Sequence, residues 1–121
     1  MQVVIVEPKK KPTVQNIDDG LEAMQKIVGG TIQAIYPFEE PIALICNDEG
    51  KFLNLPLNRA LRDNAGCVYD IVAGFFLCAA PTDKDNFASL TEEQVQTCLK
   101  RFAIPEQFIQ VGDGVFVLPA P

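Results

Sequence analysis

The most apolar segment of the chain, Val68 to Cys78, constrains the fold more than any other feature. Its side chains are apolar on both alternating faces, with Tyr69 and Ile71 on one side and Val72 on the other. A strand with this pattern needs cover on both faces. The segment is also far shorter than the roughly 20 residues that cross a bilayer. We therefore predict a central strand and no membrane span.

The size and composition predict one domain. The chain has 121 residues, of which 48% are hydrophobic and 21% charged, an ordinary globular balance. We expect a single domain over residues 1–118 and a frayed tail at 119–121. The N-terminal apolar stretch has no basic region before it, so it does not resemble a secretory signal. The four cysteines lie mostly among apolar neighbours, which favours reduced core thiols and a cytoplasmic protein.

The N-terminal third predicts a strand, a helix and a second strand. Residues 2–7 are rich in β-branched side chains and precede Pro8, and a polar connector follows. Apolar residues recur at helical spacing from Asn16 until Gly29, which is typical of a helix end. Residues 31–36 form the second strand. The two strands are either parallel neighbours or antiparallel with an intervening strand, and the sequence leaves both open.

The middle of the chain predicts a hairpin and a short helix. Residues 42–46 and 51–55 flank Asn47-Asp48-Glu49-Gly50, four turn-forming residues that end in glycine. Residues 57–64 have helical propensity over one or two turns, and Gly66 follows.

The C-terminal part predicts a loop, a helix and a closing hairpin. Residues 82–88 are polar, Thr91 and Gln94 form a capping box, and apolar residues 95, 98, 99 and 102 make one helical stripe. Residues 108–111 and 115–118 surround a Gly-Asp-Gly turn. The predicted fold class is α+β, with a mixed or mostly antiparallel sheet of about five to seven strands and two main helices.

The charge balance disfavours a nucleic-acid partner. Sixteen acids against ten bases give a net charge of −6, and no basic stripe offsets the repulsion of phosphates. The single basic run, Lys9 to Lys11, lies between prolines and is typical of a solvated loop.

Several segments together resemble the domain of unknown function 3846 family. The resemblance is carried by residues 28–30, 47–51, 55–59, 70–74 and 89–94. Members of that family occur in phages, conjugative elements and the bacteria that carry them. The resemblance therefore implies an association with mobile genetic elements, and it implies no catalytic residue.

Asn58 and Arg59, which follow Pro56, form the first candidate site. Their amide and guanidinium could bind an anion or a partner's carboxylate. Alternatively, Arg59 pairs with Asp70 while Asn58 caps the short helix, and we favour this structural interpretation.

Asp48 and Glu49 form the second candidate site, although two carboxylates on a turn lack the fixed spacing of a catalytic pair or a calcium loop. The chain contains no histidine, and its four cysteines are widely separated. We therefore expect no metal, no cofactor and no nucleophilic catalysis.

These observations favour a non-enzymatic accessory protein of a phage or mobile element that binds another macromolecule. The expected partner is a host or element protein, and counter-defence is one version of this role. The first alternative is a small-molecule or nucleotide-binding domain with a polar cleft around Asn58, Arg59 and Asp70. The second is a structural module that self-associates through the edge of its first or last hairpin.

Overall fold

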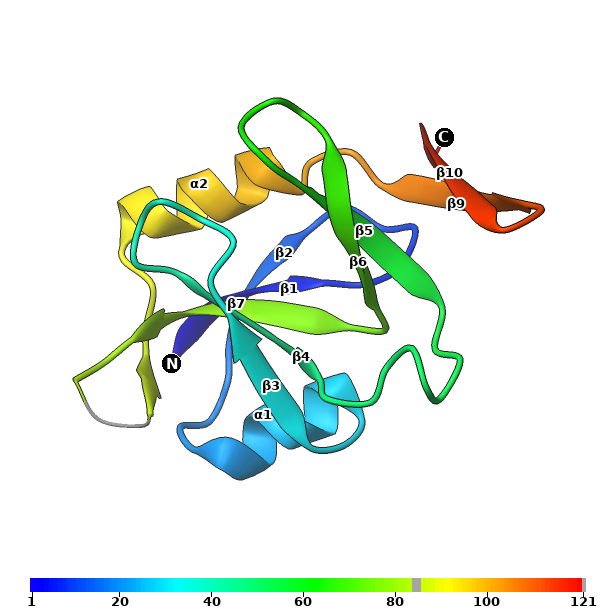
Figure 1. Cartoon of the computed structure of the whole chain (residues 1–121). Coiled ribbons are helices and arrows are strands. Elements are labelled where there is room, and N and C mark those ends of the chain that lie inside the picture. Colours follow the sequence, from blue (N-terminus) through cyan, green and yellow to red (C-terminus); the bar gives the residue numbers. More distant parts are fainter. Residues whose placement is uncertain (84–85, 121) are drawn as a thin grey trace.

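The structure is a computed structural model that describes residues 1–83 and 86–120 (Figure 1). Within these residues the chain forms two helices and ten strands, and every strand pairing is antiparallel. The predicted α+β class with a mostly antiparallel sheet is confirmed. The large sheet has six strands, within the predicted range of about five to seven, and the other four strands form two separate two-stranded sheets.

One large sheet organises the domain. Its strand order is β2-β1-β7-β4-β3, and β8 pairs with β7 beyond this path. β7 lies between β1 and β4, so part of the predicted central strand is indeed central. Because β7 and β4 separate β1 from β3, the alternative with intervening strands is the correct one. The bounds are β1 (Gln2–Val6), β2 (Thr13–Asn16), β3 (Ile32–Ile35), β4 (Ala43–Asn47), β7 (Phe76–Pro81) and β8 (Phe87–Ala88).

The two helices cover opposite faces of this sheet (Figure 1). α1 (Leu21–Val28) packs Met24 and Val28 against one face, and α2 (Glu92–Arg101) packs Val95 and Cys98 against the other. The predicted capping box of Thr91 is present. In the described part of the chain, neither helix is long and apolar enough to cross a membrane.

Glycine sets both ends of α1. The predicted end is confirmed, because Gly29 adopts the left-handed conformation with φ 80° and its N–H donates to the carbonyl of Gln25. The helix begins at Leu21, later than predicted, since Asn16 ends β2 and Gly20 has φ 102°. The residue that breaks the apparent helical pattern is therefore Gly20.

The predicted short helix at 57–64 is wrong. Residues Leu57–Arg62 form β5, which pairs with β6 (Val68–Ala73) in a separate two-stranded sheet. Burial in this sheet overrides the helical propensity of leucine, alanine and arginine. The apolar run also divides in two, because Gly74 has φ 82° and ends β6 before β7 begins.

The predicted hairpin of residues 42–46 and 51–55 is also wrong in its second strand. Residues after β4 form successive tight turns, in which the N–H of Leu53 donates to the carbonyl of Glu49 and that of Leu55 donates to Gly50. Asn54 adopts a left-handed φ of 57°, which interrupts an extended path. The segment therefore projects side chains as a loop between β4 and β5.

The closing hairpin is confirmed as β9 (Glu106–Val111) and β10 (Gly114–Pro119). Gly112 has φ 58° at the first central position of its two-residue turn, as a type II′ turn requires. Of the tail that we expected to fray, Pro119 ends β10 and the N–H of Ala120 donates to the carbonyl of Pro105. Residue 121 lies outside the described residues.

Candidate functional site

Asn58, the first of the predicted site residues, is in the interior. It is 0% exposed, and its amide nitrogen donates to the carbonyl oxygens of Val6 and Gly74, each at 2.8 Å. The pairing of β5 with β6 shifts register at this position, so Asn58 is an extra residue in its strand. Its side chain therefore joins the end of β1 to the turn between β6 and β7.

Arg59 is also buried, with 1% of its surface exposed. Its Nη2 donates to the carbonyl oxygens of Lys10 at 2.6 Å and Phe102 at 3.2 Å, and its Nη1 donates to Oδ1 of Asn58 at 3.0 Å. Phe102 caps α2, so the guanidinium lies where a helix favours a cation. Burial lowers the pKa of Arg59 from its ordinary value, and nearby Glu106 opposes that shift. The group stays charged at ordinary pH.

The predicted ion pair between Arg59 and Asp70 is wrong, and so is the cap by Asn58. Arg59 faces Val72 in the register of the two strands, whereas Asp70 forms its ion pair with Lys51 at the surface. The structure therefore separates Asp70 from Asn58 and Arg59, the other two residues of the predicted polar cleft. Ligand binding by Asn58, Arg59 or Asp70 stays a prediction, but the donors of Asn58 and Arg59 already serve backbone carbonyls.

Asp70 instead lies beside the other two candidates, Asp48 and Glu49. Together with Lys51 they line a hollow of about 350 Å³, which we call the acidic hollow. Cys46 and Phe52 also line it. Three carboxylates against one ammonium leave the hollow with an excess of negative charge. Such a hollow suits a cationic side chain.

The sequence positions this hollow through Asn47 and Gly50. Asn47 is buried, its Nδ2 donates to the carbonyl of Val28 at 3.1 Å, and its Oδ1 accepts the N–H of Glu49 at 2.8 Å. A Cβ on Gly50 would lie 2.8 Å from the carbonyl oxygen of Ala73, so only glycine allows this approach. The turn that carries Asp48 and Glu49 is thus fixed against α1 and β6.

An apolar hollow adjoins the acidic one. It measures about 380 Å³ and is lined by Leu57, Val68, Tyr69, Ile71 and Val115, with Lys51 and Asp70 at the boundary that both hollows share. Phe52 is 84% exposed and Tyr69 is 58% exposed. We call the two hollows with Phe52 the docking face. Sequence reasoning missed Phe52 because it placed this residue in a strand, although a phenylalanine within a polar turn was a usable signal.

The four cysteine thiols differ in their exposure to solvent. All four are free, and three of them are buried. Burial raises the pKa of the Cys46 thiol to about 11, and the carboxylates of Asp70 and Asp48 add to this shift. A hydrogen bond with Cys98 and burial raise the pKa of Cys78 well above its ordinary value. In residues 1–83 and 86–120, no group of three or more potential ligands is placed to hold a metal ion.

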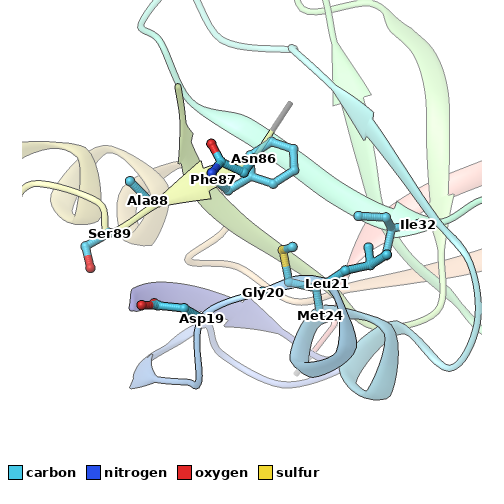
Figure 2. Close-up of a pocket in the computed structure, with 9 residues that line it drawn as sticks. All are labelled: Asp19, Gly20, Leu21, Met24, Ile32, Asn86, Phe87, Ala88 and Ser89. Atoms are coloured by element: carbon cyan, nitrogen blue, oxygen red, sulfur yellow. The ribbon is translucent and has the colours of Figure 1, made fainter. Parts of the chain in front are cut away.

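A third hollow, of about 810 Å³, lies between α1 and the segment around β8. Figure 2 shows Leu21 and Met24 of α1 on one side and Phe87 on the other. Its polar rim is largely engaged, because Asp19 pairs with the N-terminal ammonium and Oγ of Ser89 accepts the N–H of Gln2. The hollow therefore offers mainly apolar contact.

The chain matches the family Domain of unknown function (DUF3846) over residues 1–103. It belongs to this family. The family region includes the central sheet, both helices and both candidate sites, whereas β9 and β10 lie beyond it. No curated protein and no solved structure matches the chain.

The buried position of Arg59 predicts a structural role. We expect Arg59→Ala to lower the free energy of unfolding by about 3 kcal/mol, because the carbonyl groups of Lys10 and Phe102 lose a charged donor in the interior. Urea denaturation measures this change. Lys100→Ala, at an exposed position of α2, is the control and should change stability by less than about 0.5 kcal/mol. Equal stability of Arg59→Ala and the natural protein would contradict the role.

Thiol accessibility predicts one fast-reacting cysteine. At about pH 8, iodoacetamide should modify exposed Cys67 first, while Cys46 reacts slowly because its thiol is buried and largely protonated. Mass spectrometry over time measures the order. Cys67→Ser should remove the fast phase, and rapid modification of Cys46 in the folded protein would contradict the described environment.

Proposed function

We propose that this protein is a non-enzymatic accessory protein that binds another protein through its docking face. The observation that carries the proposal is Phe52, which is 84% exposed beside an acidic hollow. An exposed aromatic side chain leaves apolar surface in contact with water, which is unfavourable, and aromatic residues are enriched where proteins bind one another. Tyr69, on the other side of the Lys51–Asp70 pair, adds a second aromatic anchor.

The two hollows specify the chemistry of the partner. The acidic hollow suits a lysine or arginine side chain, and the adjoining apolar hollow suits a large apolar side chain. The partner is therefore a protein segment with a basic residue next to an apolar one. Net charge of opposite sign would speed its association with this acidic chain.

A recognition role also agrees with the chemistry of the candidate residues. The chain has no histidine to act as a general base, and the raised pKa of Cys46 makes its thiol a poor nucleophile. Asp48 and Glu49 are exposed, so they lack the desolvation that tunes catalytic carboxylates.

The resemblance to the family suggests the biological setting. In a phage or conjugative element, the partner would be a host or element protein with a basic surface. Inhibition of a host defence protein by the docking face is the counter-defence version of this proposal. The acidic charge disfavours direct binding to nucleic acid.

Selection of peptides from a random library displayed on yeast tests the proposal. We expect enriched peptides to carry lysine or arginine next to a large apolar residue. Phe52→Ser and Glu49→Gln should each raise the Kd of such a peptide by about tenfold, and added salt should weaken binding. Tyr36→Ser, at another exposed aromatic, is the control. Peptides that bind Phe52→Ser as tightly as the natural protein would refute the docking face.

A small-molecule binder is the second candidate, favoured by the hollow in Figure 2. Its volume of about 810 Å³ is within the range of ligand sites, and Met24, Ile32 and Phe87 give it apolar walls. This candidate keeps the predicted function class but moves the site away from Asn58 and Arg59.

Ligand-observed NMR with indole and adenosine as probes tests this candidate. We expect indole to bind because apolar contact dominates the hollow, and Ala88→Trp should abolish binding by filling the rim. Ala23→Trp, outside the lining residues, is the control. Binding of neither probe, or equal binding to Ala88→Trp, would exclude the hollow as an aromatic ligand site.

A further inference from the structure

One side of the closing hairpin exposes an uncharged and mostly apolar face, on which Gln107, opposite Leu118, is the polar member. Ile109 and Phe116 are directly opposite each other, and Val111 and Leu118 lie on the same side of the two strands. These four side chains, which we call the outer face, are 43–60% exposed. The other side of the hairpin turns toward the domain, where Phe108 and Val117 are half-buried.

The hairpin is attached to the domain at its base. Oε1 of buried Glu106 accepts the N–H of Ala60 at 2.9 Å, and Oε2 accepts from Nη2 of Arg62 at 2.7 Å. β9 and β10 form their own sheet and project away from the central sheet (Figure 1). An isolated two-stranded sheet is marginally stable in water. Packing of its apolar face against another protein surface would therefore stabilise it.

The outer face is uncharged in a chain of net charge −6. The hairpin contains two acids, of which Glu106 is buried at the base and Asp113 is in the turn. Two copies of an acidic protein repel each other, and this repulsion is weakest where they meet through uncharged surface. The face also has no acid to attract a basic partner, unlike the docking face.

We propose that the outer faces of two copies of this chain pack together in a symmetric dimer. In such a contact Phe116 and Ile109 of each copy meet the same apolar set of the other, as two sheets do in a sandwich. The projection of the hairpin keeps the two domains apart. Four side chains from each copy make a small contact, so the dimer forms in the micromolar range or above.

Sedimentation equilibrium of the full chain, from micromolar to hundreds of micromolar, tests the dimer. We expect the apparent mass to rise from one chain to two with concentration. Phe116→Glu should raise the dimer Kd by about a hundredfold or more, because each dimer would carry the buried carboxylate twice. Phe116→Leu should retain association. Tyr36→Glu is the matched control, since Tyr36 and Phe116 are both 60% exposed.

The effect of salt distinguishes this self-association from binding of a partner through the acidic hollow. Added sodium chloride should leave self-association unchanged or strengthen it, because screening reduces repulsion between the two acidic chains. Circular dichroism of Phe116→Glu should match that of the natural protein, since the side chain is mostly exposed. A natural chain that stays monomeric throughout, or a Phe116→Glu variant with an unchanged Kd, would overturn the proposal.

Discussion

The buried guanidinium of Arg59 fixes the relative positions of segments that are far apart in the sequence. It binds the carbonyl groups of Lys10 and Phe102, and its neighbour Asn58 binds those of Val6 and Gly74. The end of β1, the β6–β7 turn and the end of α2 thus meet at two residues of β5. A charge in the interior is costly unless several hydrogen bonds offset its desolvation, and here neutral carbonyl groups supply them. These donors are engaged with backbone carbonyl groups, and the proposed function therefore assigns recognition to other side chains.

The elements that sequence reasoning predicted well are those that depend on local signals. Gly29 ends α1 through its own conformation, Thr91 and Gln94 cap α2 across one turn, and Gly112 closes a hairpin between adjacent strands. The same reasoning failed for β5, whose leucine, alanine and arginine favour a helix when considered alone. Pairing with β6 and the buried contacts of Asn58 and Arg59 decide its conformation, and none of these is visible in a short window.

The candidate site residues also could be predicted only in part from the sequence. Asp48, Glu49 and Asp70 were selected from the sequence, and the structure brings them to one hollow. That meeting could not be predicted, because it depends on the approach of Gly50 to the backbone of Ala73. Opposite charges predict a pair between Arg59 and Asp70, whereas burial and strand register lead each residue to a different partner. Phe52 was missed because the segment was expected to be a strand.

The carboxylate of Glu106 joins the region that matches the family to the hairpin that follows it. The matched region ends at residue 103, yet the amide of Ala60 within it depends on an acceptor supplied from beyond that boundary. A relative that lacks this hairpin must provide a substitute acceptor or leave that strand open to water. β9 and β10 are therefore part of the domain that residues 1–103 form. If another segment replaced them, it would need a carboxylate or carbonyl oxygen that accepts the N–H of Ala60.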